Sequence, residues 1–590
     1  MAKNTAKKLP AVDCVLVGFG WTGAILGQEL TDAGLNVVAI ERGSWRDAST
    51  DFAVTFAQDE LRYMWRKALF EEPARETLTF RNAPSEEALP MRHLGSFLPA
   101  TGVGGAGIHW NGQTWRFLPS DFVARSHNEQ RYGKLPDDMT VQDWGVTYDE
   151  LEPHYDKFEY LCGISGKAGN LKGQIQEGGN PFEGPRAREY PNPPLDMVYG
   201  PTLFEAAAKA TGHKPFTCPA ANMSRPYTNP LGVQLGPCTY CGFCEKFGCG
   251  NYSKSSAQTT ILPVLMRKKN FELRTECNVL KVLKDDSAKR ATGVVYIDEQ
   301  GEEWEQPAEM VILCAFAHHN PHLMMLSNIG RIYDPQTGQG LIGKNYAYQI
   351  VSGVDVFFDD KILNPFVGAG ALGVGVDEYN GDNFDHSGLG FIGGGYLACW
   401  NTNGRPIEHH PTPKDTPKWG AQWKKAVAKN YLTTATISTH GAVMSHRTNY
   451  LDLDPTYRNV YGQPLLRLTF DYTDNEHKMS DYLTERATDI AKAMKAREIH
   501  PKKRTGHYDI VPYQTTHNTG GAIMGADPKS SAVNRYLQSW DLHNLFVMGS
   551  CVFPQNPGYN PTGTVGALTY WAAHAIRTQY LKNPGPLVQS

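Results

Sequence analysis

The first fifty residues alternate apolar and polar segments in a regular order. The apolar run Val12–Val17 predicts a buried strand, residues 24–33 have the spacing of a helix, and Asn36–Ile40 predicts a second strand. Strands joined through a helix in this way lie parallel in an open α/β sheet, which binds ligands at its carboxyl edge. The pattern therefore predicts a Rossmann-like domain that includes these residues.

Later segments predict that this domain is discontinuous. Residues 270–298 indicate two strands joined by a polar turn, and Glu309–Cys314 indicates a further strand of the nucleotide-binding sheet. Residues 346–507 alternate strands with glycine-rich loops, which predicts a second, sheet-based domain for the substrate. We expect an α/β fold (α+β overall) in which residues 1–345 and 508–590 build the nucleotide-binding domain.

A glycine-rich turn joins the first predicted strand to its helix. Gly18 permits the tight turn, Gly20 lets the backbone approach a pyrophosphate, and Gly23 lets the helix pack on the strand. Glu41 follows the second strand, where an acid accepts a hydrogen bond from a ribose hydroxyl. Because an acid there disfavours a 2′-phosphate, the motif predicts a site for NAD or FAD rather than NADP.

Two further segments place polar side chains among glycines. Residues 101–112 are rich in glycine, which lets a main chain lie flat against a ligand, although a flexible loop with His109 as an ordinary polar residue explains them as well. Near the C-terminus, His517 suits general-base work at neutral pH, and Asn560 can donate to or accept from a substrate hydroxyl. A structural histidine and an Asn-Pro turn are the alternatives.

Four of the eleven cysteines gather in one short segment, Cys238-x-x-Cys241-x-x-Cys244-x4-Cys249. Such compact runs let several thiolates converge on an iron–sulfur cluster, whereas zinc sites draw their pairs from separated knuckles and short-range disulfides are strained. The last spacer is longer than in ferredoxins and Gly250 replaces their proline, so the cluster type stays open. The other cysteines are scattered and are expected to be small buried hydrophobes.

Composition excludes several classes of protein. Apolar residues make up 41% and charged residues 20% of the 590 residues, as in a globular protein. The net charge of −4 and the lack of a long Lys/Arg run argue against nucleic-acid binding. No apolar stretch has the ~18 residues of a membrane-spanning helix, and Met1–Pro10 is unlike a secretory signal. Export or membrane attachment is therefore expected to come from a partner.

The motifs, taken in order, resemble those of the glucose–methanol–choline oxidoreductases, FAD enzymes that oxidise alcohols and sugars. The resemblance implies a fold of this type, with a discontinuous FAD-binding domain and a substrate domain. It also implies that His517 is the catalytic base and Asn560 its partner. The residues that it implies for FAD binding are Gly18, Gly20, Trp21, Thr22, Gly23, Glu41, Arg42, Gly102, Gly104, Gly105, His109, Asn111, Gly112, Val279, Gly549, Ser550, Pro561 and Thr562.

The loop around His109 resembles one whose histidine is linked covalently to FAD in pyranose oxidases and some sugar dehydrogenases, which implies the same linkage here. Two positions depart from the family. Gly521 stands where threonine is usual, and Cys314 is followed by Ala-Phe-Ala without the expected glycine.

The cysteine segment, residues 236–250, narrows the resemblance to the large flavoprotein subunits of bacterial membrane-bound, three-subunit dehydrogenases. This implies a three-iron, four-sulfur cluster on Cys238, Cys241, Cys244 and Cys249, one of which can be a bystander. It also implies a multihaem cytochrome c subunit as electron acceptor and anchor, a small subunit that carries the export signal, and a peripheral place at the periplasmic face of the inner membrane.

The activity implied is oxidation of a sugar acid, gluconate at C2 to 2-ketogluconate. Related FAD dehydrogenases for 2-ketogluconate, sorbitol, fructose or glucose are alternatives. So are a pyranose-oxidase-like oxidase, which would not need the cysteine segment, and a zinc-stabilised nucleotide-binding sensor without turnover.

Overall fold

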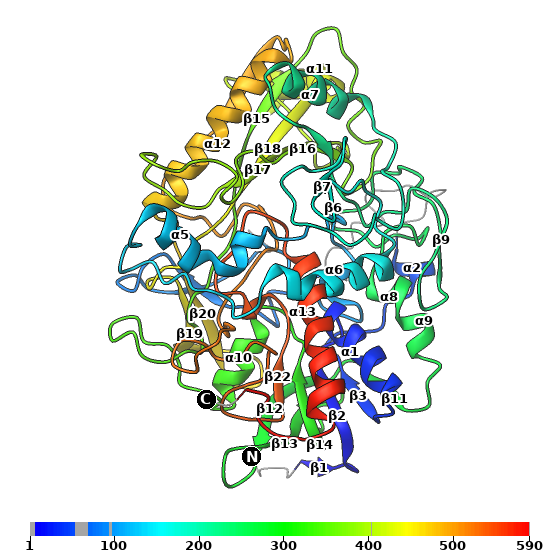
Figure 1. The fold of residues 1–590 in the computed structure, drawn as a ribbon, viewed down its shortest axis with the longest axis vertical. Coiled ribbons are helices and arrows are strands. Elements are labelled where there is room, and N and C mark those ends of the chain that lie inside the picture. Colours follow the sequence, from blue (N-terminus) through cyan, green and yellow to red (C-terminus); the bar gives the residue numbers. More distant parts are fainter. Residues whose placement is uncertain (1–5, 53–68, 94–96, 403, 589–590) are drawn as a thin grey trace.

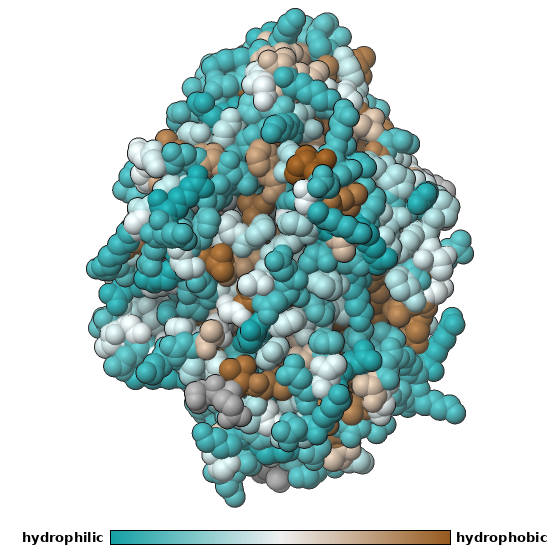
Figure 2. Space-filling view, in the orientation of Figure 1, coloured by the Kyte–Doolittle hydropathy of each residue, from teal (hydrophilic) through white to brown (hydrophobic). Residues whose placement is uncertain are grey.

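The structure, a computed structural model, describes residues 6–52, 69–93, 97–402 and 404–588. Two main sheets occupy the lower and upper halves of the molecule in Figure 1, and α6 (Tyr148–Cys162) lies between them in this view. Figure 2 shows that the same face is mostly hydrophilic, with hydrophobic groups in small, separate patches.

The lower sheet is built around β2 (Val12–Val17). β3 (Val37–Ile40) and β14 (Glu303–Leu313) flank β2 and run parallel to it. β11 (Phe271–Arg274) extends the sheet beyond β3, and β22 (Leu545–Val547) pairs in parallel with the end of β14. These parallel strands therefore end at one common edge. The sheet also contains β1 (Lys7–Lys8), β12 (Asn278–Lys284) and β13 (Ala291–Ile297).

Helices cover the parallel strands. α1 (Trp21–Asp32) follows β2 directly and is buried along almost its whole length, because α13 (Thr562–Ala575) packs against it (Figure 1). α13 also packs on α6, and this approach is close, since a Cβ on Gly566 would lie 2.4 Å from the ring of Phe158. The last helix of the chain thus completes a layer that the first residues begin.

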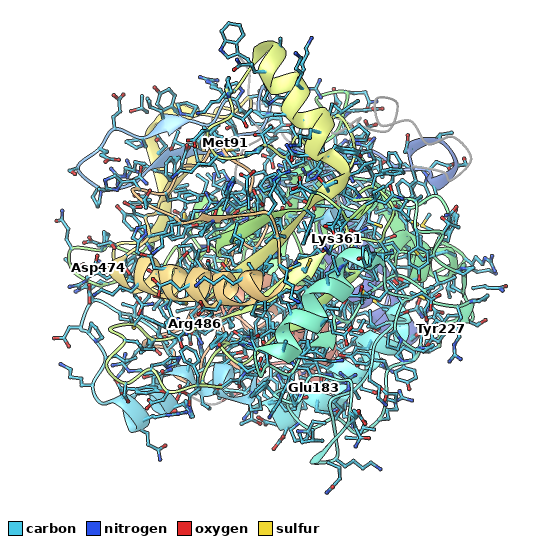
Figure 3. The ribbon with its side chains drawn as sticks, turned by 90° about the horizontal axis from the view of Figure 1, so that it is seen from above. Met91, Glu183, Tyr227, Lys361, Asp474 and Arg486 are labelled. Carbon is cyan, nitrogen blue, oxygen red and sulfur yellow. The ribbon has the colours of Figure 1, made fainter. Side chains whose placement is uncertain are left out.

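The upper sheet is antiparallel, with the strand order β21-β15-β18-β17-β16-β8. α12 (Asp474–Ala493) contacts β15 and β18, and it begins with a capping box formed by Thr473 and Glu476. Figure 3, seen from above, shows α12 with Asp474 at its start and α7 (Tyr199–Ala210) nearby. The strands are β8 (Phe216–Thr217), β15 (Ile350–Phe357), β16 (Gly373–Val376), β17 (Gly395–Trp400), β18 (Thr434–Gly441) and β21 (Glu498–Lys502).

Shorter elements complete the described fold. A smaller sheet contains β4 (Thr79–Arg81), β5 (Leu89–Pro90), β19 (Tyr450–Arg458) and β20 (Pro464–Thr469). Two hairpins pair β6 (Asn170–Leu171) with β7 (Gln174–Ile175), and β9 (Tyr227–Thr228) with β10 (Gln234–Leu235). The other α-helices are α2 (Ala48–Asp51), α5 (Ala124–Tyr132), α8 (Ala257–Thr260), α9 (Leu262–Leu265), α10 (His319–Leu326) and α11 (Gly420–Asn430).

Within the described ranges, no helix combines the length and the apolar character needed to cross a membrane.

The predicted α/β class is confirmed, and the strand, helix and strand of the first forty residues are present. α1 begins three residues earlier than predicted, because Trp21, Thr22 and Gly23 belong to its first turn. In residues 270–298 the prediction gave two strands, which are β12 and β13, and missed β11. The division of the chain at residues 345 and 507 stays a prediction; β8 joins the upper sheet from outside it.

Candidate active site

A cavity of about 620 Å³ lies between the carboxyl edge of the parallel sheet and the upper sheet. Gly18 and Glu41, which follow β2 and β3, line one end of it, and Ser438 and His440 of β18 line another part. Cofactors and small substrates bind in clefts of this size at the carboxyl edge of α/β sheets.

The three glycines after β2 have separate steric roles. A Cβ on Gly18, whose φ is +94°, would lie 2.9 Å from the carbonyl oxygen of Cys314, and a Cβ on Gly23 would lie 2.4 Å from the carbonyl oxygen of Gly18. A Cβ on Gly20 meets nothing nearer than 3.9 Å, and Gly20 lines the cavity. No side chain of a described residue caps the start of α1, so its first N–H groups are available to phosphates. This turn fits a dinucleotide.

Glu41 holds the turn together as well as facing the cavity. Its Oε2 accepts a hydrogen bond from Phe19 N (2.9 Å), and its Oε1 accepts from Gly43 N (2.8 Å) and Gly102 N (3.3 Å). A carboxylate has about four acceptor positions, so one stays available for a ribose hydroxyl. Glu41 therefore also ties the turn after β2 to the glycine-rich loop that starts at Gly102.

Arg42 lines the same end of the cavity and is already compensated by acids. It forms ion pairs with Glu71 (3.4 Å) and Glu76 (3.2 Å). Burial opposes ionisation of Glu71, but Arg42 and His319 lower its pKa to about 2, so the pair is charged at neutral pH.

His109 lies in the cavity wall within the loop that Gly102 begins. It is buried, its Nε2 has no hydrogen-bond partner among the described residues, and its ring meets that of Phe70 edge to face at 4.5 Å. Burial, and then the charge of Lys254, lower its pKa to about 3. The imidazole is therefore neutral, and its unpartnered nitrogen suits a bond to a cofactor.

His517 and Asn560 lie together in the cavity wall. His517 Nε2 and Asn560 Nδ2 are 3.1 Å apart. Asn560 Oδ1 accepts hydrogen bonds from Trp115 Nε1 (3.0 Å) and Tyr396 OH (2.8 Å). With its oxygen occupied, Asn560 turns its NH₂ group toward His517, so His517 Nε2 must be the acceptor.

On the other side of the His517 ring, Gln349 favours the same tautomer, in which Nδ1 is protonated and Nε2 is the acceptor. Its Nε2 donates to the carbonyl oxygen of Gly558 (2.7 Å), which directs its Oε1 toward His517 Nδ1, 2.6 Å away. Nδ1 therefore carries the proton and Nε2 carries the lone pair. Burial, followed by the charge of His440, lowers the pKa of His517 to about 3. The structure thus presents an unprotonated nitrogen to the cavity.

The cysteine segment packs directly against the loop that carries His109. Lys246 N donates to the carbonyl oxygen of His109 (2.7 Å). The buried Lys254 Nζ donates to the carbonyl oxygens of Trp110 (2.5 Å), Cys244 (2.5 Å) and Phe247 (2.8 Å), and so joins the two segments.

The four cysteines of the segment are free thiols. Burial and the neighbouring thiols raise the pKa of Cys238 and Cys241. N–H groups point at the sulfurs: Tyr240 N is 3.5 Å from Cys238 Sγ, and Lys254 N is 3.4 Å from Cys249 Sγ. However, no group of three or more His, Cys, Asp or Glu side chains in the described part of the chain is arranged to hold a metal ion.

The structure brings most predicted FAD residues together. Gly23, Gly104 and Gly112 stand back from the cavity: Gly23 packs on Gly18, and the other two have positive φ angles and face Ile108 and Asn222. The four cysteines of the segment 238–249 also stand outside it. The residues that line it are Gly18, Gly20, Trp21, Thr22, Glu41, Arg42, Gly102, Gly105, His109, Asn111, Val279, Gly549, Ser550, Pro561 and Thr562.

Sequence reasoning missed Gln349 and His440. Nothing near Gln349 in the sequence marks it, because its partner His517 is 168 residues away. A signal existed for His440: Thr436, Ser438 and His440 alternate along β18 with other residues, and all three line the cavity. Polar residues at every second position of a strand indicate that one face of the strand is exposed to solvent or to a cavity.

Two stretches, residues 220–351 and 445–569, match the family described as GMC oxidoreductase. The chain is also 51% identical to the gluconate 2-dehydrogenase flavoprotein of Pantoea cypripedii, over 100% of this chain and 97% of that protein. The chain belongs to the GMC oxidoreductase family. It is an FAD-dependent dehydrogenase, which confirms the family resemblance and FAD as the cofactor.

Other GMC proteins are more distant. The fructose dehydrogenase large subunit of Gluconobacter japonicus is 24% identical, over 96% of this chain and 98% of that protein. The crystal structure of pyridoxine 4-oxidase from Mesorbium loti covers 95% of this chain and 98% of its own, with a TM-score of 0.57 and 16% identity. That structure supports the fold alone. The loop after Cys314, which lacks the usual glycine, still packs against Gly18 as the fold requires.

Proposed function

We propose that this GMC dehydrogenase oxidises D-gluconate at C2 to 2-keto-D-gluconate. The observation that carries the proposal is the full-length, 51% identity to a gluconate 2-dehydrogenase flavoprotein. The neutral His517 beside Asn560 supplies the groups that oxidation of a secondary alcohol needs.

In the proposed reaction the C2 hydroxyl lies between His517 and Asn560. His517 Nε2 takes the hydroxyl proton, and Asn560 Nδ2 donates a hydrogen bond to the same oxygen, which fixes the orientation of the substrate. When bound, FAD supplies the acceptor for the hydride that leaves C2. His109, with its unpartnered Nε2, is the residue that would hold FAD covalently.

A gluconate site also needs a cation for the carboxylate. Among the described Lys and Arg residues, Arg42 and Lys246 line the cavity. Arg42 is compensated by Glu71 and Glu76 at the Glu41 end. Lys246 Nζ lies 4.7 Å from the ring centre of Tyr513, in the segment that leads to His517, and 3.6 Å from Glu408. Lys246 also has an acidic partner, but it is the cavity cation beside the segment that leads to His517, so we assign the carboxylate to Lys246.

Anaerobic bleaching of the flavin absorbance tests the substrate. Gluconate, 2-ketogluconate, sorbitol, fructose and glucose are each mixed with the oxidised holoenzyme. Fast bleaching by gluconate alone supports the proposal. Bleaching by a neutral sugar instead keeps the dehydrogenase mechanism but removes the roles of gluconate and Lys246. Release of FAD by acid precipitation from His109→Ala, but not from the wild type, supports the covalent link.

The cysteine segment is the proposed exit for electrons. Cys238, Cys241, Cys244 and Cys249 would hold an iron–sulfur cluster of the three-iron type, which would carry single electrons. The segment that contains them is joined to the His109 loop by the hydrogen bond from Lys246 N. The N–H groups aimed at the sulfurs support it. The thiols would have to converge further than they do here to share a cluster.

Metal and sulfide analysis separates the possibilities. Iron with acid-labile sulfide, lost in Cys241→Ser and kept in the control Cys14→Ala, supports the cluster. Cys14 is buried in β2, so this control changes a cysteine outside the segment. Zinc alone would replace the cluster by a structural metal site and remove the proposed electron path.

A multihaem cytochrome c subunit would accept these electrons and anchor the protein at the periplasmic face of the inner membrane, with a small subunit carrying the export signal. Co-purification of a haem protein, reduced when gluconate is added, tests this assembly. Reduction of oxygen at the same rate without any haem partner would favour an oxidase instead.

A further inference from the structure

A second histidine shares the oxygen that orients the catalytic base. Gln349 Oε1 is 2.6 Å from His517 Nδ1 and 3.3 Å from His440 Nδ1. An amide oxygen has two lone pairs, so one Gln349 oxygen can accept from both rings. Because Gln349 Nε2 is fixed on the carbonyl oxygen of Gly558, the oxygen cannot turn away. Both imidazoles therefore carry their proton on Nδ1.

This tautomer leaves His440 with a lone pair on Nε2. His440 lines the cavity, and no hydrogen bond from a described residue is found at its Nε2. The ring stacks on Tyr396, with centres 4.8 Å apart and an interplanar angle of 10°. Tyr396 is itself fixed by its hydrogen bond to Asn560. His440 is thus held rigidly, with an acceptor nitrogen and no assigned role in proton transfer.

Burial lowers the pKa of His440 to about 4, so the ring is neutral at physiological pH. A neutral acceptor in a buried wall repels the oxygens of a carboxylate and pairs with a donor. A hydroxyl is such a donor and needs no charge to be desolvated. The chemistry at this point of the cavity therefore suits an alcohol group rather than an acid.

We propose that His440 forms a second hydroxyl-binding subsite, which accepts a hydrogen bond from the hydroxyl on the carbon next to the one oxidised. Because both rings donate to the oxygen of Gln349, both present Nε2 as an acceptor, so two neighbouring hydroxyls are bound together. For gluconate, these are the hydroxyls on C2, at His517, and on C3, at His440. The inference rests on the proposed function, since it requires a polyol substrate.

The test compares kcat/KM for gluconate and 3-deoxygluconate in the wild type and in His440→Phe. Phenylalanine keeps the stacking on Tyr396 and removes the acceptor. Losing one hydrogen bond in a buried site costs roughly 10- to 100-fold, so the wild type should favour gluconate by about that factor. His440→Phe should lose the same factor on gluconate and show a ratio near one. An unchanged ratio in a variant that keeps its FAD would overturn the subsite.

Gln349→Glu tests the shared orientation separately. A carboxylate still accepts from both Nδ1 atoms, although it has no N–H for the carbonyl oxygen of Gly558, and its charge favours the protonated form of His517. The acid limb of kcat/KM should therefore move to higher pH, which a merely structural role would not cause. An unmoved limb would contradict the positioning role of Gln349.

Failure of the proposed function has a different signature. If gluconate does not bleach the flavin, the ratio is measured with the polyol of the panel that does, against its analogue lacking the hydroxyl next to the oxidised carbon. A ratio that collapses in His440→Phe then supports the subsite without gluconate, and a preserved ratio overturns it.

Discussion

At the scale of single residues, the proposed reaction depends on the lone pair of His517 Nε2. His517→Ala removes the proton acceptor while leaving Asn560 held by Trp115 and Tyr396. We expect flavin reduction to slow by roughly 10²- to 10⁴-fold, the usual contribution of a general base, with FAD still bound. Stopped-flow bleaching measures this. The exposed His507, ten residues away, provides the control His507→Ala, which should reduce the flavin at the wild-type rate.

The pH profile tests the environment of the same residue. The pKa of His517 is about 3, far below the ~6.5 of an exposed histidine, so the base form persists at every pH above that value. As pH falls from 8 to 5, kcat/KM should therefore stay level instead of losing activity near 6.5. Short assays at each pH, with the enzyme returned to neutral pH to confirm recovery, measure the profile. A fall in kcat/KM with an apparent pKa near 6.5 would mean that His517 is exposed to solvent during turnover.

The residues of the proposed catalytic pair could be predicted from the sequence, but the hydrogen bonds that orient them could not. His517 and Asn560 were found because their motifs resemble a family. Gln349 has no such motif, and its contact with His517 exists only once the upper sheet lies over the cavity. The same holds for Glu41: its role toward ribose followed from its place after β3, whereas its hydrogen bond to Gly102 N joins distant segments.

At the scale of elements, the glycines between β2 and α1 have different roles, one in helix packing and one in cofactor binding. A Cβ on Gly23 would lie 2.4 Å from a backbone oxygen, so Gly23→Ala must push the helix away. A Cβ on Gly20 would lie 3.9 Å from its nearest neighbour, and Gly20 lines the cavity, where this glycine lets the backbone approach a pyrophosphate. Gly23→Ala should therefore lower both the thermal midpoint and the FAD content, and Gly20→Ala mainly the FAD content. Differential scanning fluorimetry and flavin absorbance measure both, and equal midpoints for the two variants would contradict this assignment.

The predictability of elements followed the sequence distance of their partners. β2, α1 and β3 are neighbours in the chain, and their period and turn residues are enough to predict them. β11 was missed because it is short and pairs with β3, more than two hundred residues earlier. β8 is shorter still, and only β16 gives it a place in the upper sheet. Such short strands are stabilised by pairing with a strand that is distant in the sequence, and a local sequence pattern does not indicate this pairing.

At the scale of the whole molecule, the fold buries several histidines as neutral rings. Burial lowers the pKa of His109, His318 and His517 to about 3 and that of His440 to about 4. In the unfolded chain these side chains titrate near ~6.5. Between these pKa values the unfolded state binds more protons than the folded state. The free energy of unfolding therefore falls as the pH decreases below about 6.5, and the pH has no such effect above that value.

His318 isolates one contribution to this pH dependence, because it lies outside the catalytic pair. Its ring packs among Phe97 at 4.9 Å and Phe316 at 5.3 Å, so His318→Phe suits the site. Below pH 6.5 the free energy of unfolding of the variant should fall less steeply than that of the wild type. The two slopes should differ by up to about 1.4 kcal/mol per pH unit, the effect of one proton. Urea unfolding at intervals between pH 5 and 8 measures the slope, with the exposed His410→Phe as control. Parallel curves for wild type and His318→Phe would show that His318 reaches water before the protein unfolds, and that the buried rings are not what limits this fold in acid.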